Sequence, residues 1–335
     1  MVKNILQRSE DSRRTRALHR LTVALLFAVS LLSLFIIHEN VSAVFCALAG
    51  ALLYKVGTDR SAGLTRLLGL ALQLAGSYVF LDIVFYPFQA ASFANYYFYG
   101  CLLIGCSAVY TGFCIDRLQS SPKKWEGALS SFIIFWGMCW LYYGGIREIS
   151  THSLGVGKYN MLLLYFCAVT IVMTIVSEKL HWLRLSLAQI ILLPAAFVCG
   201  LWGLVEVSGF YHLFGSRGWI AWMVTFFCLY RLLHHYDGIW PARLVGFWHI
   251  GCLWLVVIVF AHEVGWFCFT SLDLPFFLCL SVRFGLTMLA GLFVLLLRNM
   301  KVWPVTGYRK YYIWGGILLP AVGIVVHELV LILGG

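Results

Sequence analysis

Charged residues are scarce in this sequence. Only 11% of its 335 residues are Asp, Glu, Lys or Arg, whereas a soluble globular domain typically has about 25%. Because 61% of the residues are hydrophobic and the mean hydropathy is +0.88, too little polar surface is available to cover a water-soluble body. The chain is therefore expected to be an integral membrane protein.

Several catalytic and binding signatures are also absent. The sequence has no GxxxxGK[ST] phosphate loop, no GxGxxG after a strand, no GxSxG elbow and no HExxH zinc motif. Its eleven cysteines include no CxxC pair, and most lie in apolar runs, where they fit as small packing residues. We expect no cofactor and no metal, and ATP-driven transport by this chain alone is disfavoured.

The formal charge of +10 raises the question of nucleic-acid binding, but the placement of the basic residues argues against it. They lie in short segments between apolar runs, as residues that orient membrane helices do. The expected partner is the lipid bilayer, and a protein partner in the membrane is left open.

Apolar runs of membrane-spanning length recur along the chain, and a helix needs roughly 20 residues to cross a bilayer. They predict an all-α polytopic transmembrane helical bundle over residues 21–335, preceded by a basic cytoplasmic tail at residues 1–20. No repeat of fixed period is found. We predict eleven spans: Leu21–Ile37, Val41–Val56, Leu67–Phe85, Tyr97–Ile115, Ala128–Tyr143, Tyr159–Val176, Ser186–Val205, Gly218–Leu233, Val245–Ala261, Leu274–Leu297 and Tyr312–Ile332.

The distribution of basic residues predicts the orientation of these spans. If the N-terminus is cytoplasmic, the inner segments carry 20 of the 24 lysines and arginines. The outer segments then carry only Arg147, Lys158 and Arg217, and Arg283 lies within a span. Basic residues concentrate on the cytoplasmic side of membrane proteins. We therefore expect a cytoplasmic N-terminus and a periplasmic C-terminus.

From about residue 64 onward the chain resembles a known family. The stretches that carry the resemblance are Leu67–Gln73, Phe93–Asn95, Trp136–Ile149, Gly218–Trp222 and His234–Tyr236, together with His249 and His262–Trp266. They are similar to the later half of a family of uncharacterised, predicted polytopic bacterial membrane proteins of the domain-of-unknown-function kind. The resemblance implies a multi-pass location in the bacterial inner membrane. Typical members look longer, which implies a reduced member or a separately encoded partner, and the resemblance implies no activity.

Charges within a membrane are expensive, so each one is a candidate for function. Arg283 is the deepest, about 13 Å from the outer start of its predicted span at 1.5 Å per residue. One hypothesis is an outward-facing polar site in which Arg283 binds an anionic group and Glu263 or Glu328 exchanges protons or binds a cation. The alternative is a structural ion pair that fixes helix register. The acidic residues toward the same side are Asp82, Glu206, Glu263 and Glu328.

Three histidines, His38, His262 and His327, each precede a glutamate on the predicted outer side. They indicate either a metal site or proton relay, or simply polar ends at the membrane interface. Arg147 and Glu148 follow the fifth span. They suggest either an outer-face binding role or a salt-bridged turn that caps the span.

Three functions remain open from the sequence. The first is a transporter or permease component for a small, perhaps anionic, solute. The second is a structural or assembly subunit of a cell-envelope complex. The third is a membrane enzyme that acts on a lipid-linked substrate at the outer face, with Glu148, Glu206 or His262 as acid or base.

Overall fold

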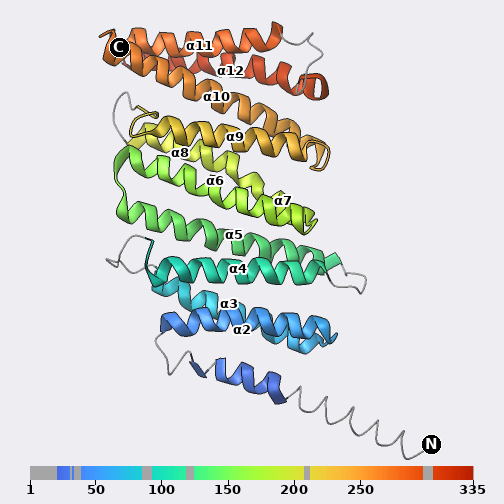
Figure 1. The fold of residues 1–335 in the computed structure, drawn as a ribbon. Coiled ribbons are helices and arrows are strands. Elements are labelled where there is room, and N and C mark those ends of the chain that lie inside the picture. Colours follow the sequence, from blue (N-terminus) through green and yellow to red (C-terminus); the bar gives the residue numbers. More distant parts are fainter. Residues whose placement is uncertain are drawn as a thin grey trace, which may run out of the picture. The chain divides into compact units, whose positions relative to one another are not determined.

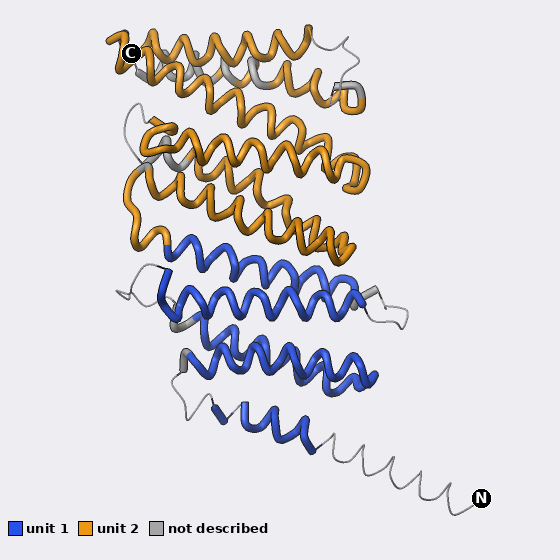
Figure 2. Tube along the Cα trace, in the orientation of Figure 1, with its two compact units in different colours: residues 1–148 blue, residues 149–335 orange. Residues whose placement is uncertain are grey.

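The computed structural model describes residues 21–30, 32–33, 39–84, 93–117, 124–206, 212–296 and 305–334. Within these ranges all regular structure is helical. The chain divides into two compact units, residues 1–148 and residues 149–335, which Figure 2 colours separately. Each unit is described by itself below.

Unit 1 contains two long helical hairpins (Figure 1). The first is formed by α2 (Glu39–Asp59) and α3 (Gly63–Val84), and the second by α4 (Tyr96–Asp116) and α5 (Lys124–His152), whose last turn continues past the unit boundary. A shorter apolar helical run covers Leu21–Ser30. Helix α2 packs against both α3 and α4.

Small residues allow α2 and α3 to approach closely. A Cβ added to Gly50 would lie 2.5 Å from the carbonyl oxygen of Gly69, and a Cβ added to Gly69 would lie 2.6 Å from the carbonyl oxygen of Gly50. One heptad away on each helix, a Cβ on Gly76 would lie 2.5 Å from the carbonyl oxygen of Ala43. The two backbones therefore touch along a seam of small residues, as is common between helices in membranes.

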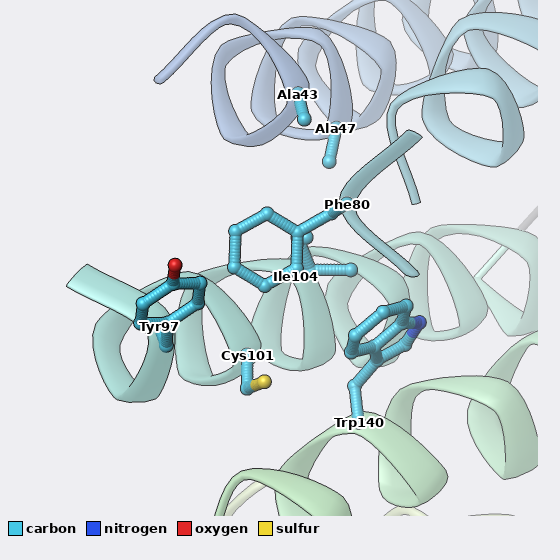
Figure 3. Close-up of a cluster of buried hydrophobic side chains, with 7 residues drawn as sticks. All are labelled: Ala43, Ala47, Phe80, Tyr97, Cys101, Ile104 and Trp140. Atoms are coloured by element: carbon cyan, nitrogen blue, oxygen red, sulfur yellow. The ribbon is translucent and has the colours of Figure 1, made fainter. Parts of the chain in front are cut away.

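A buried cluster joins α2, α3, α4 and α5. Phe80 of α3 is fully buried, and its ring centroid lies 5.8 Å from that of Trp140 of α5. Figure 3 shows Phe80 between α2 and α4, with a ring of buried neighbours around it. This cluster comprises Ala43, Ala47, Phe80, Tyr97, Cys101, Ile104 and Trp140.

Unit 2 begins with α6 (Gly155–Lys179), followed by α7 (Leu183–Ala188), a 3-10 turn η1 (Gln189–Ile191) and α8 (Leu192–Glu206). It continues with α9 (Gly218–Tyr236), α10 (Ala242–Ser271), α11 (Phe276–Leu296) and α12 (Val305–Gly334). The single predicted span Ser186–Val205 is thus interrupted by η1. The interruption precedes Pro194, which has no amide proton to donate to residue 190 and clashes with its carbonyl in a regular helix.

The helices of unit 2 have two chemically different ends. We call the end at the α6–α7 and α9–α10 turns the basic end, because it carries Lys179, Arg184, Arg231, Arg243, Arg309 and Lys310. We call the other end, at residues 212–217 and at the α10–α11 turn, the opposite end. Large apolar side chains are exposed along α11, among them Phe277, Leu289 and Phe293, as expected of a surface in contact with lipid.

The described residues confirm the predicted all-helical fold class. Within the described residues, eight helices are long and apolar enough to cross a bilayer: Val41–Asp59, Gly63–Leu81, Tyr96–Asp116, Gly127–His152, Gly157–Lys179, Leu183–Leu201, Ala242–Ser271 and Phe276–Leu296. They correspond to eight of the eleven predicted spans. Helices α9 and α12 and the run Leu21–Ser30 coincide with the other three but do not belong to these eight, so eleven crossings and the orientation of the termini stay predictions.

The seam of small residues predicts a sharp difference between two glycine-to-alanine variants. Gly69→Ala should lower the thermal midpoint of the purified protein in detergent by several degrees, because overpacking of a tight contact costs about 1–3 kcal/mol. Gly285→Ala is the matched control, since a Cβ there meets nothing within 4 Å and alanine favours the helix. Equal stability of the Gly69→Ala variant and the unsubstituted protein would contradict the seam.

Candidate functional site

The strongest candidate in unit 2 is a polar cluster at Glu263 of α10. Glu263 is only 9% exposed, yet both of its carboxylate oxygens have partners. Nδ1 of His212 lies 2.8 Å from Oε2, and the backbone amide of Phe214 donates to Oε1 at 3.3 Å. The His212 ring stacks on Trp266 with centroids 3.8 Å apart and planes 9° apart. Trp266 is three residues after Glu263, so both face the same side of α10.

Arg283 approaches this cluster from α11. Its side chain lies against Gly265 of α10, where any Cβ would overlap it. Arg283 is half-buried. It is seven residues from the start of α11, and Glu263 is eight residues from the end of α10. At 1.5 Å per residue both are about 10–12 Å from the same end of the helices, the opposite end.

His212 and Glu263 differ in their access to water. The side chain of His212 is 35% exposed, whereas that of Glu263 is 10% exposed. His212 thus connects the buried carboxylate with the surface at the opposite end. With Arg283 nearby on α11, the region holds a guanidinium, a carboxylate and an imidazole.

A second carboxylate cluster lies in unit 1 at Glu148 of α5, which is 6% exposed. Its Oε1 accepts the backbone amide of Phe93 at 2.5 Å, and its Oε2 accepts Nδ2 of Asn95 at 2.8 Å. Asn95 in turn caps α4, because its Oδ1 accepts the amide of Phe98 at 2.9 Å. The guanidinium of Arg147 lies 4.3 Å from the ring centroid of Tyr97. Arg147 and Glu148 therefore tie the end of α5 to the start of α4.

The same arrangement is found in both units. In each, a long second helix of a hairpin carries a buried glutamate, and this glutamate binds the amide of a phenylalanine just before the first helix of that hairpin. The hairpins are α4–α5 in unit 1 and α9–α10 in unit 2. We call this arrangement the glutamate tie. An earlier helix of the same unit also packs on the first helix of each hairpin, α2 on α4 and α6 on α9.

The other predicted site residues are His262 and five residues whose side chains the structure does not describe. His262 is 4% exposed in α10 and precedes Glu263, about 100° around the helix. The backbone at Asp82, Glu206, His327 and Glu328 is helical, but their side chains lie outside the described residues, as does all of His38. Among the described side chains, no group of three or more His, Cys, Asp or Glu residues is placed to hold a metal ion.

Two residues of the unit 2 cluster were missed by the sequence reasoning. His212 is 51 residues before Glu263 in the chain, and no local pattern links the two. Gly265 stands between Glu263 and Trp266, and only the contact with Arg283 shows why a residue without a side chain is needed there. The two ties share one sequence feature. In both, the Phe that donates its amide precedes the accepting Glu by about 50 residues.

The glutamate tie predicts a local change in amide hydrogen exchange. Glu263→Ala should speed exchange at Phe214 by roughly tenfold or more, since a hydrogen bond to a charged group contributes about 1.5–3 kcal/mol. Glu178→Ala is the matched control, because that exposed carboxylate pairs with His235 at 3.2 Å on the surface. Exchange is measured by mass spectrometry on protein in lipid nanodiscs. Unchanged protection at Phe214 in the Glu263→Ala variant would exclude the tie.

One comparison with known proteins gives a match. The model of the family described as "Predicted membrane protein (DUF2339)" matches residues 4–334. This match begins well before residue 64, where the resemblance described from the sequence begins, and so includes the first predicted spans. No curated protein and no solved structure matches the chain.

Proposed function

The chain belongs to the DUF2339 family of predicted membrane proteins, and from that premise we propose that it is a permease component for a small anionic solute in the bacterial inner membrane. In this proposal the residues from 21 onward form one transmembrane domain that crosses about eleven times, and residues 1–20 are a cytoplasmic tail. The basic end of unit 2 faces the cytoplasm and the Glu263 cluster faces the periplasmic half, because basic residues are retained on the cytoplasmic side.

The observation that carries the proposal is that Arg283 packs on Gly265 of α10, two residues from the buried Glu263, whose carboxylate contacts His212. An arginine some 10 Å into the apolar region is expensive, and such residues usually mark a path for ions or substrates. Gly265 leaves room for the guanidinium against α10. An arginine is also the side chain best suited to grip a carboxylate or phosphate group, because its N–H donors form a planar fork.

In this proposal the protonation of His212 couples proton binding to anion binding. With a neutral imidazole, the charges of Arg283 and Glu263 cancel, and the cluster attracts an anion weakly. With a protonated imidazole, two cations surround one carboxylate and the net charge becomes +1. In a medium of low dielectric constant this charge favours the entry of an anion. Proton binding and anion binding then strengthen each other, as thermodynamic linkage requires, and a proton gradient drives anion uptake.

A second function, a structural or assembly subunit, is favoured by one observation. Both Glu148 and Glu263 already bind two donors from the loop before a hairpin, so each can serve rigidity alone. A structural role predicts that removing the charge of Arg283 changes stability and leaves solute flux unaffected. An enzyme would need an acid or base free to act, and Glu148 is already engaged with Phe93 and Asn95.

The permease proposal is tested by uptake of radiolabelled succinate and inorganic phosphate into proteoliposomes. Uptake of at least one of these anions should exceed that of protein-free liposomes and rise as the external pH is lowered, because the proposed mechanism takes up protons with the anion. Arg283→Gln should reduce uptake at least tenfold, because the anion loses its permanent cation. His212→Gln should retain the slow uptake seen at alkaline pH and lose the acid stimulation.

Lys158→Gln is the matched control. It removes one positive charge near the start of α6, at the same end of unit 2 as the cluster, where Lys158 lies over the ring of Tyr159. It should transport at the unsubstituted rate. Circular dichroism and size-exclusion profiles establish that the variants are folded. If the unsubstituted protein takes up neither anion, or if a folded Arg283→Gln variant transports normally, the permease function is wrong and the structural role takes its place.

A further inference from the structure

A second polar cluster lies near the basic end of unit 2, far along α10 from Glu263. His249 is 1% exposed and is seven residues into α10, about 10 Å from its start at 1.5 Å per residue. Its Nδ1 is 3.0 Å from the hydroxyl of Tyr312 in α12. Its Nε2 is 3.9 Å from Oδ1 of Asp237, which directly follows α9. The imidazole thus has a carboxylate on one nitrogen and a phenol on the other.

Of the three groups, Asp237 is the most exposed to water and the two rings are buried. The side chain of Asp237 is 27% exposed, whereas His249 is 1% exposed and Tyr312 is 9% exposed. An imidazole can accept a proton on one ring nitrogen while it releases another from the second nitrogen. This property lets a histidine pass a proton between two partners, and the ring must regain its first tautomer before it passes another. The distance of 3.9 Å exceeds a hydrogen bond by about 1 Å, so transfer requires Asp237 to close onto the ring.

Neighbouring groups fix the ring and define its electrostatic environment. Tyr308 stacks on His249 with centroids 4.4 Å apart, at the point where α12 is kinked (φ −124°, ψ 26°), and its hydroxyl donates to the backbone carbonyl of Asp237 at 3.3 Å. The titratable groups that the described contacts bring to the ring are therefore Asp237 from the end of α9 and both tyrosines from α12. Three basic residues, Arg243, Arg309 and Lys310, are exposed at the starts of α10 and α12.

We propose that Asp237, His249 and Tyr312 form a proton-release site that connects the interior of unit 2 with water at its basic end. A proton that reaches Tyr312 from the interior takes the place of the hydroxyl proton, which passes to Nδ1 of His249. The ring gives the proton on Nε2 to the carboxylate of Asp237, which releases it to water. The ring then returns its remaining proton from Nδ1 to Nε2 before the next transfer. The inference rests on the proposed proton-coupled function, since it supplies the exit for protons that enter at His212.

A purely structural role explains this cluster less well. The stacking of Tyr308 on the ring and the packing of α10 on α12 do not need an ionisable group. Burying the imidazole of His249 and the phenol of Tyr312 costs free energy that apolar side chains of similar volume would avoid. The cluster joins residues from three segments of the chain: Asp237 directly after α9, His249 in α10 and Tyr312 in α12.

The first test measures protonation and is independent of transport. An infrared titration of protein in lipid films follows the imidazole and tyrosine bands as the pH is changed. We expect a tyrosine band to change together with an imidazole band. Tyr312→Phe should abolish this tyrosine change, and His249→Gln should abolish both changes. Tyr308→Phe is the matched control and should retain both, because its hydroxyl bonds the backbone of Asp237 rather than the ring. If the tyrosine bands of the unsubstituted protein stay unchanged when the imidazole is protonated, the proposed proton path is wrong.

The second test separates two modes of transport in proteoliposomes. Uptake of succinate or phosphate driven by a pH gradient needs proton release, whereas exchange of internal for external anion at equal pH does not. His249→Gln, Tyr312→Phe and Asp237→Asn should each reduce gradient-driven uptake at least tenfold and leave exchange within about twofold. Equal loss of both modes, or of neither, would overturn the proton-release site. Coupled infrared bands in a protein that transports neither anion would instead reject the permease function and leave the proton path standing.

Discussion

A polar group in an apolar medium must find its partner within the protein, and the structure depends on this constraint. Helices satisfy their own backbone, but the segments that lead into them do not. In each unit a buried glutamate meets that need by binding the amide of a phenylalanine before a helix, Phe93 in one case and Phe214 in the other. The glutamate tie therefore sets where α4 and α9 begin, and the clusters around Glu148 and Glu263 are built upon it.

Much of the fold follows from the sequence, because the residues within a segment determine whether that segment forms a helix in a membrane. The apolar runs predict the helices, and the structure has a helix at or within each predicted span. The departures have local causes. Helix α5 runs to His152, well past the predicted Tyr143, since a helix can continue beyond the apolar core into the polar interface. The turn η1 divides one predicted span because of Pro194, whose effect on the preceding turn a hydropathy pattern does not register.

The candidate sites were only half predictable, since they join residues that are distant in the chain. Arg283 and Glu263 stand out as charges in apolar runs, and the sequence alone indicates both. His212 and Gly265 do not stand out, because a histidine in a loop and a glycine in a helix are ordinary features. The same holds for His249, whose partners Asp237 and Tyr312 lie on two other elements. Which charged residues meet is decided by helix packing, and a single sequence carries little information about it.

The glutamate tie also has a consequence for the order of assembly during synthesis. Phe93 and Asn95 precede α4, whereas their acceptor Glu148 follows about 50 residues later, near the end of α5. The loop that enters α4 must therefore wait for its acceptor until the whole hairpin has left the ribosome and entered the bilayer. The same delay applies to Phe214 and Glu263. Each hairpin therefore completes its packing only when its second helix is in place, because the glutamate of that helix binds the amide before the first helix.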